Sequence, residues 1–113
     1  MAIIEVGMGG LLDSTNVCQP DLTAISTIGL DHMALLGSTL GEIAEQKAGI
    51  IKTSIPIVTG KIDREALEVI QRVATSKQAP TYLYGQSYQV DWLGSEETGE
   101  VFSLENEWRD YSI

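Results

Sequence analysis

Apolar and polar residues follow two different patterns along this chain, and the change comes near Gly85. Before that residue, short apolar runs alternate with longer stretches of helical periodicity. Runs of this length bounded by Gly and Pro are typical of buried strands. They predict strands at residues 2–6, 22–28, 55–59 and 80–85.

Two segments between these runs are predicted to be helices. The first begins at Thr39, where Thr39-Leu40-Gly41-Glu42 fits a capping box, and extends to about Lys52. The second covers residues 64–77 behind a capping Asp63, and its apolar residues recur with helical spacing. Strands that alternate with helices predict an α/β layered domain with a parallel sheet, and we expect helices on both faces of that sheet.

The C-terminal segment shows a strand pattern of another kind. "SYQVDW" alternates, with Tyr88, Val90 and Trp92 on one face, and "EVFSLE" follows the turn-rich stretch "GSEETG". This pattern indicates an antiparallel hairpin with one face in water. We therefore expect one α/β region at residues 1–85 and an antiparallel β excursion of the same domain at residues 86–113.

Charge and cysteine content narrow the classes of function. The chain has 113 residues, with 16 acids against 7 bases, and a formal net charge of −9. This balance argues against nucleic acid as a partner and against binding to an anionic membrane surface. The single cysteine, Cys18, has no partner for an internal disulfide, and there is no apolar run long enough to cross a membrane. A cytoplasmic location is the expectation.

Three features, which comprise four candidate residues, fall where parallel α/β sheets bind ligands, beyond the carboxyl ends of the strands. Glu5 lies near the end of the first predicted strand, before the glycine-rich "GMGG". Asp31 and His32 follow the second strand, and Lys47 lies on the next helix. Glu5 is either a solvated carboxylate or a ligand for a cation such as Mg²⁺. For His32, a structural role and a ligand role both stay open.

Lys47 occupies a position on its helix where an apolar residue is expected. It continues the stripe formed by Leu40, Ile43 and Ala44. In one interpretation its aliphatic stem is buried and its ammonium group stays in water. In the other, desolvation favours the neutral amine, which attacks electrophiles or takes up CO₂ to form a carbamate, an anionic metal ligand. Periodicity does not choose between the two.

The glycine-rich segment lacks both common phosphate-binding spacings. "GMGGLLDSTN" contains neither G-x-G-x-x-G nor G-x-x-x-x-G-K-[ST]. Asp13 and Asn16 are expected to cap or shape this loop.

Three stretches together resemble one enzyme family. "EVGMGGLLDSTNV", "STIGLDHMALLGSTLGEIAEQKAGIIK" and "PIVTG" are similar to folylpolyglutamate synthase/dihydrofolate synthase of the Mur ligase superfamily, with order and spacing kept over residues 3–60. The resemblance implies part of a P-loop-type central ATPase domain. It also implies a reaction in which ATP phosphorylates a carboxylate of folate or dihydropteroate and L-glutamate displaces the phosphate.

The resemblance also implies roles for three of the four candidate residues. Glu5 and His32 would bind Mg²⁺, and Lys47 would be carbamylated and assist metal binding. The family's ATP loop, which ends in Gly-Lys-Ser or Gly-Lys-Thr, lies upstream of "EVG", and its C-terminal domain lies downstream. We therefore expect a fragment that is inactive alone. Leu11 stands where many members have an arginine, which puts in doubt a substrate contact there.

Two alternatives stay open. One is a fragment of a Mur-type ligase that acts on a cell-wall precursor. The other is a folded remnant without catalytic activity, which would self-associate through an unpaired sheet edge.

Overall fold

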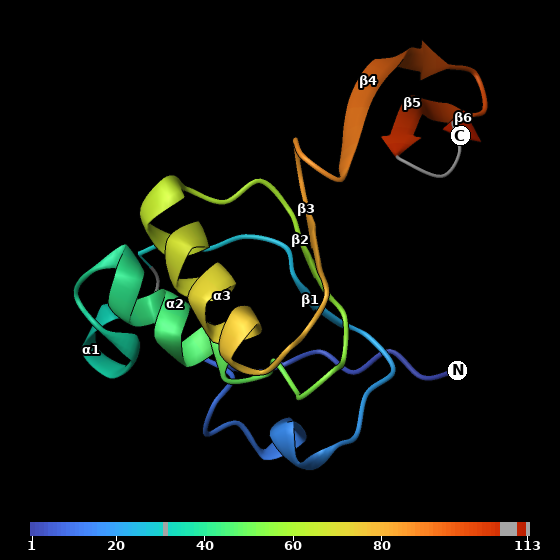
Figure 1. Ribbon diagram of the computed structural model, residues 1–113. Coiled ribbons are helices and arrows are strands. Elements are labelled where there is room, and N and C mark those ends of the chain that lie inside the picture. The colour runs from blue at the N-terminus through green and yellow to red at the C-terminus, as the bar shows by residue number, and fades with distance from the viewer. Residues whose placement is uncertain (31, 107–110, 113) are drawn as a thin grey trace.

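The computed structural model describes residues 1–30, 32–106 and 111–112 and contains two separate three-stranded sheets (Figure 1). The first is parallel, with strand order β1-β2-β3, and the second is antiparallel, with order β4-β5-β6. In chain order the elements are η1 (Ser14–Val17), β1 (Thr23–Ile25), α1 (Met33–Leu36), α2 (Leu40–Ala48), β2 (Ile57–Thr59), α3 (Arg64–Ser76), β3 (Thr81–Leu83), β4 (Tyr88–Glu96), β5 (Gly99–Asn106) and β6 (Tyr111–Ser112). The α/β class and the hairpin predicted from the sequence are confirmed.

The register of the parallel sheet separates a buried face from an open one. Ile25, Thr59 and Leu83 lie side by side across β1, β2 and β3, and all three are buried. Their neighbours Ala24 and Val58 point the other way, and they are exposed and half-buried respectively. Since successive side chains of a strand point to opposite faces, only one face of this sheet belongs to the core.

Both packed helices cover that buried face, so the expectation of helices on both faces was wrong. Figure 1 shows α2 and α3 side by side on the same side of β1, β2 and β3. The reason is topological. The sheet order advances in one direction, and parallel crossovers share one hand, so both crossovers return over the same face. The core between helices and sheet consists of Ile25, Ile28, Ile43, Ala44, Ala48, Ile51, Ile57, Ala66, Ile70, Ala74 and Ala79.

The predicted strand at residues 2–6 is also wrong. This segment forms no strand, and Ile3 and Ile4 are 90% and 57% exposed. A strand needs a neighbour for its backbone hydrogen bonds, and an apolar run needs cover on both sides. The described part of the chain supplies neither to residues 2–6, although their sequence favours a strand.

The three strands of the parallel sheet are shorter than predicted, at three residues each. β2 and β3 begin directly after Pro56 and Pro80, which have no N–H to donate to a ladder. At the far end of β2, Gly60 lies against the backbone of Ser26, where a Cβ would be 2.1 Å from the carbonyl oxygen. This contact needs a glycine.

Helix α2 begins as the sequence predicts and ends earlier. The side chain of Thr39 accepts from the Glu42 N–H, and the Glu42 carboxylate accepts from the Thr39 N–H, which is a complete capping box. The helix ends at Ala48 and not near Lys52, because the N–H groups of Gly49, Ile50 and Ile51 donate to carbonyl oxygens three residues back, which ends the α-helical pattern. Asp63 precedes α3 as predicted, but its side chain makes no capping hydrogen bond.

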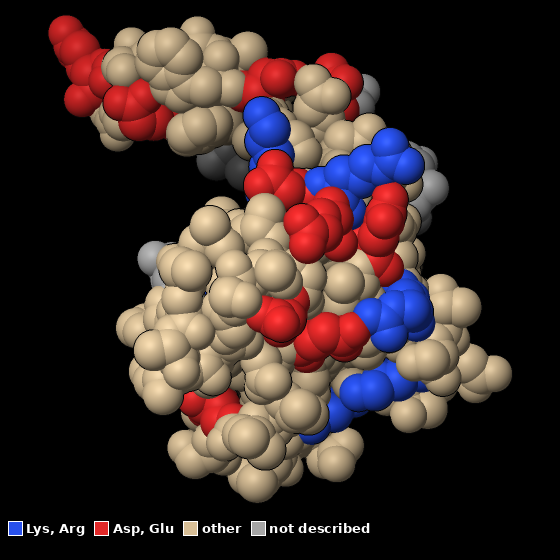
Figure 2. Space-filling model, turned by 90° about the vertical axis from the view of Figure 1, so that its left-hand side faces the viewer, with Lys and Arg blue, Asp and Glu red and all other residues tan. Residues whose placement is uncertain are grey.

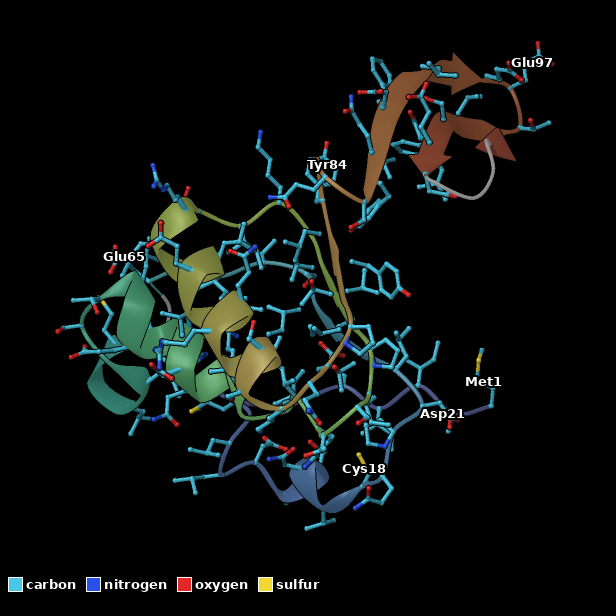
Figure 3. All side chains as sticks on the ribbon, in the orientation of Figure 1. Met1, Cys18, Asp21, Glu65, Tyr84 and Glu97 are labelled. Carbon is cyan, nitrogen blue, oxygen red and sulfur yellow. The ribbon has the colours of Figure 1, made fainter. Side chains whose placement is uncertain are left out.

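Charged side chains link the outer surfaces of the helices. Arg72 of α3 pairs with Glu45 of α2, and Arg64 pairs with Glu68 within α3. Glu65, at the N-terminal end of α3 (Figure 3), accepts from the Gly41 N–H of α2 at 3.2 Å. Figure 2, which views the helix side, shows acidic and basic groups next to one another there. This surface is a mixed-charge solvated face.

The hairpin leaves the parallel sheet at a pair of tyrosines. Tyr84 lies at the corner (Figure 3), and its ring meets that of Tyr88 edge-on at 5.7 Å. The Tyr88 hydroxyl donates to the Thr59 carbonyl oxygen at 2.7 Å. The alternation predicted for Tyr88 and Val90 holds, but Trp92 is 62% exposed, beside a bulge between Trp92 and Gly94.

Over the described residues, none of the helices has the length and apolar character that crossing a membrane requires.

Candidate functional site

The glycine-rich segment before η1 is shaped by Asp13. One carboxylate oxygen accepts from the Thr15 hydroxyl at 2.6 Å and the Thr15 N–H at 2.9 Å, and the other accepts from the Met8 N–H at 3.1 Å. These bonds, with that from the Thr15 hydroxyl the largest cause, lower the pKa of Asp13 from 3.8 to about 2. The expectation that Asp13 shapes this loop is confirmed.

The same segment is fastened to the C-terminal end of α2. Leu11 donates its N–H to the Gln46 carbonyl oxygen at 2.9 Å, and the Asn16 amide donates to the Gly49 carbonyl oxygen at 3.1 Å. The last carbonyl groups of a helix have no partner within the helix, and here the glycine-rich segment supplies donors to this end of α2. Among the glycines of this segment, Gly10 makes the close backbone contact with α2, since a Cβ there would lie 2.8 Å from the Gln46 carbonyl oxygen.

His32 has a backbone conformation that few residues adopt. Its φ of 54° and ψ of 37° are left-handed, and it is the residue directly before α1. The side chain is exposed and forms no capping hydrogen bond. Because sparsely populated conformations concentrate at functional sites, this geometry agrees with a functional role for His32. Asp31, its predicted neighbour in the site, lies outside the described residues.

Lys47 lies in the last turn of α2 and is half-buried. It continues the apolar stripe predicted from the sequence, since Ile43 and Ala44 are fully buried. Two other lysines lie near this end of the helix with carbonyl partners: Lys52 donates to Asn16, and Lys77 donates to Ile51. Lys47 faces a hollow.

That hollow brings two of the three predicted residues together. It has a volume of about 180 Å³ and is lined by Val6, Gly7, Met8, Gly9, His32, Leu36 and Lys47. The glycine-rich segment forms one wall, and His32 and Lys47 come from the segment before α1 and from α2. Glu5 is exposed and directly precedes Val6, but it is not itself one of the lining residues.

The donor groups of the hollow fit a divalent cation only if Lys47 carries CO₂. Among the described residues no group of three or more His, Cys, Asp and Glu side chains is placed to hold a metal. An imidazole and a protonated amine do not make a cation site, because an ammonium group has no lone pair. A carbamate on Lys47 would supply the anionic oxygen that Mg²⁺ prefers.

Sequence reasoning missed three lining residues, Val6, Met8 and Leu36. Met8 and Leu36 lie in the wall, and Gly9 packs against Leu36, where a Cβ would meet the Leu36 side chain at 3.0 Å. Met8 sits inside the glycine-rich motif, which could have indicated it. Nothing in the short apolar run around Leu36 distinguishes this residue from a core residue.

Comparison with known proteins gives consistent results. No family model matches the chain. The chain is 46% identical over 112 residues to the dihydrofolate synthase/folylpolyglutamate synthase of Bacillus subtilis (strain 168). This match covers 96% of the chain and 25% of that protein. The chain is 36% identical over 107 residues to the folylpolyglutamate synthase of Lacticaseibacillus casei, covering 95% of this chain and again 25% of that protein.

Solved structures agree in fold. The apo form of L. casei FPGS superposes with a TM-score of 0.88 at 34% identity, over 97% of this chain and 28% of that one. A complex described as FPGS–AMPPCP–folate gives the same values. The chain thus spans about a quarter of the length of these relatives. In sequence and in fold, this chain belongs to the folylpolyglutamate synthase/dihydrofolate synthase family, of whose members it corresponds to one segment.

Proposed function

We propose that this chain supplies the cation-binding and phosphate-facing edge of an ATP-dependent ligase that joins L-glutamate to folate or to dihydropteroate. In this proposal ATP phosphorylates the acceptor carboxylate, and the amine of glutamate then attacks the resulting acyl phosphate and displaces phosphate. A cytoplasmic location belongs to the same proposal and rests on the unpaired Cys18.

One observation carries this proposal. His32 and Lys47 lie 15 positions apart in the sequence, in different elements, yet both line one hollow with the glycine-rich segment. The relatives named above support the choice of ligase chemistry, since one of them is described as an FPGS complex with AMPPCP and folate.

Each residue has a stated task. Lys47, as the neutral amine, attacks the carbon of CO₂: an N–C bond forms, a proton leaves to solvent, and an anionic carbamate results. The carbamate, the Glu5 carboxylate and the His32 imidazole would then hold Mg²⁺. When bound, Mg²⁺ neutralises charge on the phosphates and orients the γ-phosphate of ATP.

Carbamate formation is tested by NMR with ¹³C-bicarbonate. The proposal expects a carbamate carbonyl resonance that grows with pH and is lost in Lys47→Arg. Lys52→Arg is the matched control, because Lys52 lies near the same end of α2 and its ammonium group already contacts the Asn16 carbonyl oxygen at 2.8 Å. Absence of the resonance, or its loss in Lys52→Arg and not in Lys47→Arg, would contradict the role of Lys47.

The nucleotide part of the proposal is tested by calorimetry with MgATP at a CO₂-equilibrated pH. We propose that the 113-residue chain is inactive by itself, since its sequence contains no Gly-Lys-Ser or Gly-Lys-Thr loop. No heat of binding is therefore expected. Saturable binding would show that the chain holds a complete nucleotide site and would refute this part.

A further inference from the structure

We propose that Asn16 is a positioning residue for the hollow, which it serves by clamping the glycine-rich segment to the end of α2. This inference rests on the proposed function for its importance, but two of its three readouts do not depend on that function. Asn16 lies outside the hollow, and acts on it through Leu11 and Gly49.

The side chain of Asn16 joins two parts of the chain that are 33 positions apart. Its amide nitrogen lies 3.1 Å from the Leu11 carbonyl oxygen, within its own segment, and 3.1 Å from the Gly49 carbonyl oxygen, beyond α2. Lys52 also binds this residue, since its ammonium nitrogen lies 2.8 Å from the Asn16 carbonyl oxygen. Asn16 thus has partners both in the loop and at the helix end.

Asn16 stabilises a close contact between the Gly10 backbone and the carbonyl groups at the end of α2. A Cβ on Gly10 would be 2.8 Å from the Gln46 carbonyl oxygen and 3.0 Å from that of Lys47. Backbone therefore lies directly on backbone, and this contact holds only while the hydrogen bonds keep the segment in register.

The two carbonyl groups that receive the segment flank Lys47. Gln46 accepts from the Leu11 N–H and Gly49 accepts from the Asn16 amide, one residue before and two residues after Lys47. Earlier in the same segment, Gly7 to Gly9 form the wall that Lys47 faces. A segment released from Gly49 would therefore move the wall relative to the Lys47 ammonium group.

The test compares the full chain with two variants of Asn16 and one control. Asn16→Ala removes the donor, and Asn16→Asp keeps the shape but points a carboxylate at two carbonyl oxygens. Gln19→Glu makes the same amide-to-carboxylate change on a nearby exposed side chain. The readouts are amide exchange at Leu11 and Ile70, the ¹³Cε resonance of Lys47, and the fraction of Lys47 carbamate at fixed bicarbonate.

In both Asn16 variants we expect exchange at Leu11 to rise by about tenfold or more, the effect of losing one or two hydrogen bonds locally. The Lys47 resonance should shift, and the carbamate fraction should fall at least about twofold. Exchange at Ile70, in the core, should stay unchanged. The control variant Gln19→Glu should match the parent chain in all these readouts. A rise at Ile70 equal to that at Leu11 would overturn the proposal, because the effect would then be global. An unmoved Lys47 resonance in Asn16→Ala would overturn it as well.

Failure of the proposed function gives a different result. If the parent chain forms no carbamate, the role of Lys47 is refuted, but exchange at Leu11 and the Lys47 resonance still decide whether Asn16 positions the segment.

Discussion

Gly49 and Leu11 are in direct backbone contact: a Cβ on Gly49 would lie 2.4 Å from both the Cα and the Cβ of Leu11. Gly49 has a φ of −58° and a ψ of −18°, which any residue adopts. The glycine is therefore required by space and not by backbone conformation. This contact fixes the glycine-rich segment against α2, and with it one wall of the hollow.

Substitution of this glycine tests the contact. Gly49→Ala should lower the free energy of unfolding by about 1–3 kcal/mol, the usual cost of overpacking, although alanine is the better helix former. Gly41→Ala is the matched control within α2, because a Cβ there meets the flexible end of Glu65 at 3.1 Å. It should change stability by less than about 1 kcal/mol. Urea denaturation measures both, and equal effects would contradict the steric explanation.

Asp13 should make stability depend on pH in acid. Its folded pKa of about 2 lies below the ordinary value of 3.8, so it stabilises the fold above about pH 4, and this contribution is lost as pH falls from about 4 toward 2. In the variant Asp13→Asn, the loss of stability over the same pH range should be smaller. The ¹³Cγ titration of Asp13 gives the pKa itself, and a midpoint near 3.8 would rule out the described bonds.

The capping box of α2 should contribute measurably to stability. Thr39→Ala removes the acceptor for the Glu42 N–H and should cost about 1 kcal/mol of unfolding free energy, while Thr39→Ser keeps the hydroxyl and should cost much less. Helical content measured by circular dichroism during urea unfolding distinguishes the two. Equal costs for both variants would show that the hydroxyl is not the cause.

The hairpin should be held to the parallel sheet by Tyr88. Tyr88→Phe removes the donor to the Thr59 carbonyl oxygen and should cost about 1 kcal/mol. Tyr84→Phe removes a longer bond, 3.4 Å to the Val90 carbonyl oxygen, and should cost less. Burial is the larger cause that raises the pKa of Tyr88, and the neighbouring Tyr84 is the smaller one, so alkaline titration of Tyr88 offers a second measurement.

The sheet edge should promote self-association, as expected from the sequence. Among the described residues, β1 pairs with β2 and its other edge has no strand beside it. Light scattering should therefore show a mass that rises with concentration, and Ala24→Lys, a charge on this exposed strand residue, should reduce it. A monomer at all concentrations would refute the expectation.

Local chemistry made several elements predictable. The Thr39 capping box depends on residues three positions apart, and the hairpin depends on alternation between neighbours, so both follow from short stretches of sequence. Lys47 is recognisable because it is a charged residue at a position of an apolar stripe, and His32 because it follows a strand and a glycine. Their roles as metal ligands stay predictions.

Long-range packing decided the rest. Residues 2–6 have the composition of a strand, but no neighbouring strand pairs with them in the described structure. Both helices cover one face because of strand order, which local periodicity does not contain. By itself the sequence determined which residues favour helix, strand or turn, and which side chains carry usable chemistry. Only the tertiary structure decided that Leu11 packs against the backbone of Gly49 and that His32 and Lys47 line the same hollow, because such contacts join residues far apart in the chain.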